Sequence, residues 1–216
     1  TGDTRTVHAF TATTAIWFLC PVIGALPAVL HLGIPLINAY FESASSLTTT
    51  GLTLYSNLPK SLTLWRSIQA WIGGAGIVVL ALIGIFGFTQ SAKLSEAEGR
   101  EERLRPNIVK SVRMVWEIYI LLTVLGIILL LGSGIPLFYA TNLSMQAIST
   151  TGIDDIGIHM YPGAKLSLMA IMIMGAISFL AHYKYMKGNL TAYFKDTQTK
   201  IILALIAIIT LITLPY

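Results

Sequence analysis

Two copies of the tripeptide Thr-Thr-Gly have residue types and spacing that could do chemistry. They are Thr49-Thr50-Gly51 and Thr150-Thr151-Gly152, which lie 101 residues apart. Glycine permits left-handed backbone conformations that turn successive carbonyls toward one axis, and threonine adds a hydroxyl without adding charge. Within a membrane, such carbonyls can replace the hydration shell of a cation. Neither loop contains a carboxylate, which favours a monovalent ion over calcium or magnesium.

The two tripeptides belong to an internal repeat. Gly33-Ile34-Pro35-Leu36 recurs as Gly134-Ile135-Pro136-Leu137 at the same offset of 101 residues. Nine of the twenty positions from 33 to 52 are identical to their counterparts, where ordinary residue usage would give about one or two. Two copies of one membrane unit account for this pattern.

Another interpretation of the tripeptides is purely structural. Serine and threonine runs usually satisfy helix ends and turns, and a single Thr-Thr-Gly favours that interpretation. Here the tripeptide occurs at the same place in both copies, each time after an apolar segment too short to span a bilayer. This context favours a cation site.

Composition indicates an all-α integral membrane protein. Hydrophobic residues make up 55% of the 216 residues and charged residues only 11%, about half of what a soluble domain carries. The single cysteine, Cys20, allows neither a disulfide framework nor a thiolate metal site. His31, His159 and His182 lack the spacing of metal ligands. Because the chain starts at Thr1 and ends within an apolar run, we expect it to be a piece of a longer protein.

Hydropathy divides each copy into a helix, a short re-entrant segment with a loop, and a second helix. A span needs about 20 apolar residues, and shorter segments followed by polar loops are typical of re-entrant elements. The expected segments are 9–30, 36–47 and 67–92 in the first copy, then 109–131, 137–148 and 166–183 in the second, with the second loop at 149–153 and a further apolar element at 201–214.

We therefore predict parallel repeats of helix, re-entrant pore helix with filter loop, and helix. The expected units are a first repeat at 1–92, a cytoplasmic connector at 93–107, a second repeat at 108–188, and a connector with the start of a third repeat at 189–216. Two crossings per copy make the repeats parallel, unlike inverted-repeat carriers. Eleven of the 14 lysines and arginines fall on the face opposite the loops, which predicts cytoplasmic connectors and outer loops. The net charge of +4 thus reports topology and not nucleic-acid binding.

Several motifs resemble one family. The run from Phe41 to Thr53, followed by Leu64-Trp65-Arg66-Ser67 and Trp71-Ile72-Gly73-Gly74-Ala75-Gly76-Ile77, is similar to the first pore repeat of the Trk/Ktr/HKT potassium transporter superfamily, most closely its TrkH membrane subunits. The run from Ala147 to Gly152, with residues 175–182 and 192–196 downstream, looks like the second repeat. The resemblance covers nearly the whole chain.

The resemblance implies potassium uptake across the cell membrane by a multi-pass protein in which four such repeats build one filter. It also implies a cytoplasmic nucleotide-binding regulatory subunit, a homodimer of the full-length protein, and no cofactor besides the transported potassium ion. By similarity, loop carbonyls coordinate the ion and the first residue of each loop adds a hydroxyl. The implied ligands are Thr48, Thr49, Thr50, Gly51, Leu52, Ser149, Thr150, Thr151, Gly152 and Ile153.

Alternative functions stay open. An oligomeric pore-type cation channel could be assembled from several short chains, and sodium or proton coupling could accompany potassium transport. A membrane enzyme would need a catalytic pair, but no constellation of His, Asp and Ser falls together on the predicted spans.

Asp154 and Asp155 follow the second loop and could concentrate cations at its mouth, or form a solvated acidic turn.

Three charged residues near the spans have possible roles. Glu42 lies in the first short segment and could hydrogen-bond to the loop backbone as structural support. Arg66 could brace the outer mouth or extend to the membrane surface. Glu117 follows Arg113 by four residues, which favours an ion pair near the cytoplasmic boundary over an intramembrane relay.

Overall fold

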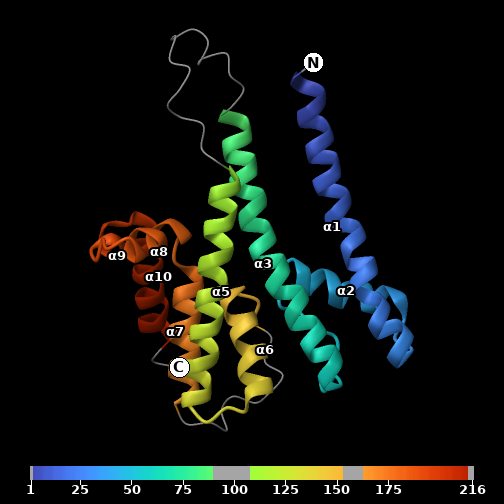
Figure 1. Cartoon of the computed structure of the whole chain (residues 1–216). Coiled ribbons are helices and arrows are strands. Elements are labelled where there is room, and N and C mark those ends of the chain that lie inside the picture. Colours follow the sequence, from blue (N-terminus) through green and yellow to red (C-terminus); the bar gives the residue numbers. More distant parts are fainter. Residues whose placement is uncertain (1, 90–107, 153–162, 214–216) are drawn as a thin grey trace.

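A computed structural model of the chain describes residues 2–89, 108–152 and 163–213. The expected connector at 93–107 and the end of the second loop, including Ile153, therefore lie outside the described residues. Every regular element in the described part is a helix, as predicted (Figure 1). These helices are α1 Gly2–Leu32, α2 Leu36–Leu47, α3 Lys60–Thr89, α5 Ile108–Gly132, α6 Leu137–Ile148, α7 Ala164–Ala176, α8 Phe179–Met186, α9 Ala192–Lys195 and α10 Thr197–Thr213.

The Gly-Ile-Pro motif sets the boundary between the first long helix and the short helix of each copy. Gly33 and Gly134 end α1 and α5 in the left-handed conformation, with φ of +64° and +84°, which glycine adopts without steric cost. Pro35 and Pro136 then precede α2 and α6, where a missing N–H and a fixed φ suit a helix start. The bounds of both short helices confirm the predicted segments 36–47 and 137–148.

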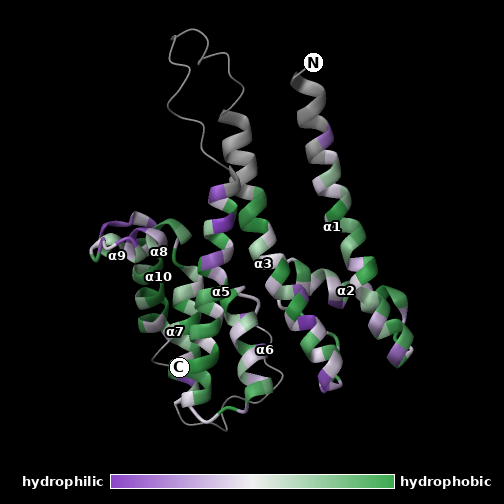
Figure 2. Cartoon of the chain, in the orientation of Figure 1, coloured by the Kyte–Doolittle hydropathy of each residue, from purple (hydrophilic) through white to green (hydrophobic). Residues whose placement is uncertain are grey.

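Long apolar helices surround the two short ones. Among the described residues, Thr11–Leu32 and Lys110–Gly132 are long and apolar enough to cross a membrane. Helix α3 has 30 residues, or about 45 Å at 1.5 Å per residue, against a hydrocarbon core of about 30 Å. Figure 2 shows hydrophobic residues along most of α5, α7 and α10, with polar residues gathered at the cytoplasmic end predicted for α5.

The predicted span at 166–183 is divided into two helices by a sharp bend. Helices α7 and α8 meet at an angle of 97°, because Ile177 between them is extended, with φ of −73° and ψ of 143°. Because of the bend, the carbonyl of Met174 lacks the backbone N–H donor that it would have in a continuous helix. His182 replaces it, with Nε2 donating to that carbonyl at 2.9 Å and Nδ1 lying 2.9 Å from the Tyr193 hydroxyl. Hydropathy could not reveal this exchange of partners.

Helix α3 joins the two copies. The Trp71 indole donates to the Thr123 hydroxyl on α5 at 2.9 Å, and the Tyr119 hydroxyl donates to the Trp71 carbonyl at 3.0 Å. The Gln146 amide on α6 donates to the Ser67 hydroxyl on α3 at 2.9 Å, and both residues are buried. The second short helix is thus fastened to the first copy, which fixes how the two loops lie relative to each other.

Candidate functional site

Each Thr-Thr-Gly loop begins with the same backbone turn at the end of its short helix. In the first copy, the N–H of Thr49 donates to the Ser46 carbonyl at 3.0 Å and that of Thr50 to the Ser45 carbonyl at 2.9 Å. The second copy repeats both bonds 101 residues later, at 3.1 and 2.9 Å. This pair of bonds defines a Schellman motif, in which the last carbonyls of a helix are satisfied by the residues that follow it.

Alternate residues of both loops adopt the left-handed conformation. Thr49 and Gly51 have φ of 54° and 78°, and their counterparts Thr150 and Gly152 have φ of 58° and 79°. A β-branched residue pays a steric penalty in this conformation, roughly 1–2 kcal/mol. Both copies carry the same strain at the same position. Strain that recurs in this way is typical of sites where the backbone itself has a function.

The two loops lie against each other. A Cβ atom built on Gly51 would stand 1.9 Å from the carbonyl oxygen of Thr151, so the two backbones are in direct contact. A Cβ atom on Gly152 would meet nothing within 4 Å among the described residues. The structure therefore brings the two predicted loops together on one side and leaves the matching position of the second loop open.

Loop hydroxyls are engaged with their own short helices. Thr48 donates to a carbonyl of α2 at 2.8 Å and lies 2.8 Å from the Thr50 hydroxyl. Ser149 likewise donates to a carbonyl of α6 at 3.1 Å and lies 2.7 Å from the Thr151 hydroxyl. These hydrogen bonds rigidify each loop.

Backbone carbonyls of the first loop differ in their partners. The carbonyl of Leu52 accepts a hydrogen bond from the buried hydroxyl of Ser45 at 2.6 Å. In the part of the chain that the structure describes, the carbonyls of Thr49, Thr50 and Gly51 accept no hydrogen bond. These three oxygens therefore remain available to a ligand, and their chemistry suits a dehydrated cation.

Two glycines of α3 allow this helix to support both loops. A Cβ atom on Gly73 would stand 1.8 Å from the carbonyl oxygen of Leu47, the last residue of α2. A Cβ atom on Gly74 would lie 2.8 Å from Cβ of Ser149, where the second loop begins. Small residues at these two positions permit this close backbone approach.

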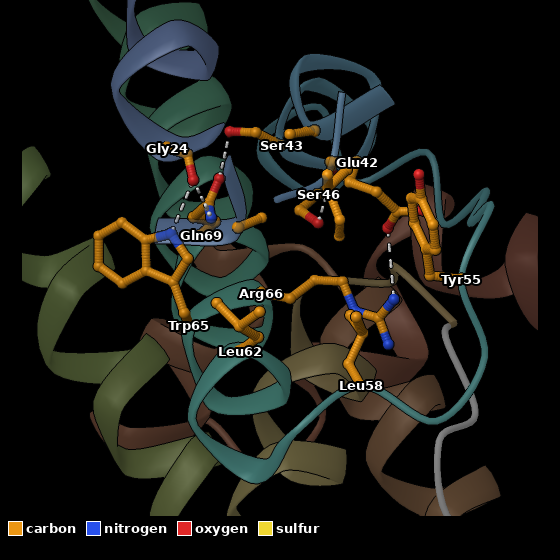
Figure 3. Close-up of a pocket in the computed structure, with 13 residues that line it drawn as sticks. Gly24, Glu42, Ser43, Ser46, Tyr55, Leu58, Leu62, Trp65, Arg66 and Gln69 are labelled. Atoms are coloured by element: carbon orange, nitrogen blue, oxygen red, sulfur yellow. Dashed lines mark hydrogen bonds and ion pairs between the residues drawn. The ribbon is translucent and has the colours of Figure 1, made fainter. Parts of the chain in front are cut away.

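A buried ion pair between Glu42 and Arg66 supports the first loop (Figure 3). Arg66 on α3 is 3% exposed and Glu42 on α2 is 8% exposed, and Nη1 lies 3.3 Å from Oε2. The carboxylate also accepts a hydrogen bond from the Thr53 hydroxyl at 2.9 Å and one from the N–H of Leu54. The interpretation of Glu42 as support for the loop backbone is confirmed. Arg66 is buried against Glu42 and does not extend to the surface, and its role at the outer mouth stays a prediction.

Sequence reasoning missed a second polar cluster beside this pair. The Ser43 hydroxyl on α2 contacts the Gln69 amide oxygen at 2.5 Å, and Gln69 Nε2 and Trp65 Nε1 donate to the Gly24 carbonyl at 3.3 and 2.8 Å (Figure 3). A Cβ atom on Gly24 would overlap Ser43 at 2.2 Å. One signal could have revealed the cluster, since an uncharged amide within an apolar span needs a buried partner.

Two other charged residues singled out in the sequence pair with each other on α5. Arg113 and Glu117 form the expected i,i+4 pair at 2.9 Å, with side chains 80% and 61% exposed within the chain. Asp154, Asp155 and His159 lie outside the described residues. Among the described residues, no three side chains of His, Cys, Asp or Glu are grouped as a metal site would require.

Comparison with known proteins identifies the family. The TrkH family model, described as "Cation transport protein", matches residues 2–215. An uncharacterized cation transporter of Methanocaldococcus jannaschii is 40% identical over 214 residues, which cover 95% of this chain and 44% of that protein. The Trk system potassium uptake protein TrkH of Salmonella typhimurium is 26% identical over 230 residues, covering 98% of this chain and 48% of that protein.

The fold agrees with a solved structure. The crystal structure of the potassium transporter TrkH from Vibrio parahaemolyticus matches with a TM-score of 0.78 and 24% identity, over 94% of this chain and 44% of that one. The chain thus spans less than half the length of these relatives. The match confirms the all-α membrane fold with several crossings, and the family comprises cation transport proteins and not enzymes. The recurring strained loops, their supporting helices and the family match over residues 2–215 together show that this chain belongs to the TrkH family of cation transport proteins.

Proposed function

We propose that this chain supplies two of the loops that form the filter of a potassium uptake protein in the cell membrane. The observation that carries this proposal is the contact between Gly51 and the Thr151 carbonyl, because it brings equivalent loops from two repeats together. Relatives named as Trk potassium uptake proteins support potassium as the transported ion.

Loop chemistry favours a monovalent cation. In each loop, carbonyl oxygens replace the hydration shell of the ion without contributing a formal charge. The short helices α2 and α6 end at the loops, so the partial negative charge of each helix C-terminus adds to the attraction. In this proposal, the filter binds potassium strongly enough for the ion to enter it and weakly enough for the ion to leave it. Of the ten proposed ligands, those described by the structure contribute mainly through their carbonyls.

Additional loops complete the filter in this proposal. Gly51 contacts the loop of the next repeat, so Gly152 would contact the loop of a third repeat in the same way. Among the described residues nothing lies within 4 Å of a Cβ atom on Gly152, and this observation and the greater length of the relatives both support the arrangement. By family resemblance, we further propose a homodimer of the full-length protein, a cytoplasmic nucleotide-binding regulatory subunit, and no resident cofactor.

The test is ion uptake by the natural gene product that contains this chain, expressed in a host lacking its own potassium uptake. We expect uptake of potassium and rubidium, with sodium competing weakly. Gly152→Ala should reduce this uptake strongly, while Gly134→Ala should not, because both glycines have positive φ but only Gly152 lies in a filter loop. Unchanged uptake in Gly152→Ala would contradict the filter proposal.

An oligomeric channel and coupled transport give different results in the same system. An oligomeric channel predicts a mass in detergent equal to several copies of a short chain around one pore. Coupling predicts that potassium uptake depends on a sodium or proton gradient at constant membrane potential. We expect one gene product per pore.

A further inference from the structure

We propose that Glu42, Arg66 and Thr53 form a positioning unit that sets the ion selectivity of the first loop. This inference rests on the proposed filter function and concerns how one loop is held in shape. None of the three side chains is proposed to touch the ion. They act on the backbone that follows the loop, at Thr53 and Leu54.

The unit closes the first loop at its exit. At its entry, the loop is tied to α2 by the backbone bonds of Thr49 and Thr50. At its exit, Glu42 on the same helix accepts hydrogen bonds from the Thr53 hydroxyl at 2.9 and 3.1 Å and from the N–H of Leu54. Both ends of the loop are therefore held by hydrogen bonds to one helix. The carbonyls between them cannot easily move closer together to coordinate a smaller ion.

Arg66 holds the carboxylate in place. Its Nη1 lies 3.3 Å from Glu42 and donates to the Thr53 hydroxyl at 3.0 Å, so α3 is joined to the same point. The adjoining cavity has a volume of about 30 Å³, room for only one or two water molecules. A charge in such surroundings needs its partner, because bulk water cannot replace it. Glu42 and Arg66 carry opposite charges, and in this proposal the loop carbonyls set the ion preference.

The second repeat lacks this unit. The positions that correspond to Glu42 and Arg66 are Leu143 and Ser167. Leu143 is a buried core residue, and the Ser167 hydroxyl contacts the hydroxyl of Ser133 at 2.6 Å. Two loops with the same tripeptide and the same left-handed residues thus differ at the positions of the ion pair. This difference makes the first loop the one whose selectivity depends on a buried ion pair.

The experiment measures the ratio of potassium to sodium uptake by the natural gene product in the membrane of the deficient host. Three variants are compared with the parent: Thr53→Val, Arg66→Ser, and the double variant Glu42→Leu with Arg66→Ser. The double variant gives the first repeat the residues of the second at the two positions of the ion pair, and removes both of its charges together. The matched control is Glu117→Leu with Arg113→Ser, which removes an exposed ion pair of the same chemical type.

We expect Thr53→Val and the double variant to lower the selectivity ratio about tenfold, since one hydrogen bond to a charged group corresponds to roughly one order of magnitude. Arg66→Ser should also lower the amount of protein in the membrane, and the double variant should restore that amount without restoring the ratio. The control should keep the parent ratio.

Two results overturn the proposal, and they are distinguishable. A selective parent whose ratio is unchanged in Thr53→Val and in the double variant shows that the pair only stabilises the fold. A parent without potassium uptake overturns the proposed function and this assignment with it. Because Thr53→Val keeps the ion pair and nearly the same side-chain volume, failure to fold does not obscure its result.

Discussion

Substituting Gly51 by alanine tests the contact between the two loops directly. The added Cβ would stand 1.9 Å from the Thr151 carbonyl oxygen, whereas real Cβ atoms essentially never come closer than 3.0 Å. The two backbones must therefore separate by about 1.1 Å. Neither atom belongs to a flexible side chain, so the loops themselves must move.

The free-energy cost has two parts. Alanine at a φ of +78° pays roughly 1–2 kcal/mol for the left-handed conformation. Separating packed backbones adds roughly 1–3 kcal/mol, the usual cost of overpacking. Gly33→Ala is the matched control, because its φ is +64° and its Cβ would meet nothing within 4 Å among the described residues. Gly33→Ala therefore has only the free-energy cost of the left-handed conformation.

Function should suffer more than stability. A misplacement of about 1 Å in a positioned group can lower a rate on the order of 100-fold. We expect potassium or rubidium uptake by Gly51→Ala to fall by that order, with protein still present in the membrane. Gly33→Ala should retain uptake within a few-fold of the parent. Equal uptake by the two variants would refute the idea that the first loop coordinates ions in contact with the second.

Three further predictions follow from individual contacts. Gly73→Ala should lower both the thermal unfolding temperature and uptake, whereas Gly76→Ala on the same helix meets nothing within 4 Å among the described residues and should change neither. His182→Ala should destabilise the bend between α7 and α8 by about 1–3 kcal/mol, because the partly buried carbonyl of Met174 loses its donor; hydrogen exchange of α8 would detect this. Asp196→Ala should cost about 1 kcal/mol at the start of α10, measured as thermal stability in detergent. Hydrogen bonds from Thr199 hold the pKa of Asp196 below its ordinary 3.8, so this contribution is present at neutral pH and is lost as the pH falls below that value.

Local signals in the sequence were sufficient to predict the short helices and the loops. Glycine, proline and an apolar run of fixed length determine where α2 and α6 begin and end, and the 101-residue repeat ties the two predictions together. The break at Ile177 could not be predicted in this way. Isoleucine is compatible with helix and extended backbone alike, and the bend depends on His182 and Tyr193, which lie farther along the chain. The repeat boundaries at 92 and 108 stay a prediction.

The position of Glu42 shows why a site could be located from sequence while its supports could not be fully assigned. A carboxylate in an apolar segment must find a partner, and the repeat offers Lys60 and Arg66 as the cations that follow it. The role of Thr53 needed coordinates, since a single threonine after a glycine has many possible partners. Once placed, its hydroxyl is the only atom of the described residues that contacts both the Glu42 carboxylate and Arg66 Nη1 at hydrogen-bond distance. For that reason, removing this one hydroxyl separates the positioning of the loop from the stability of the ion pair.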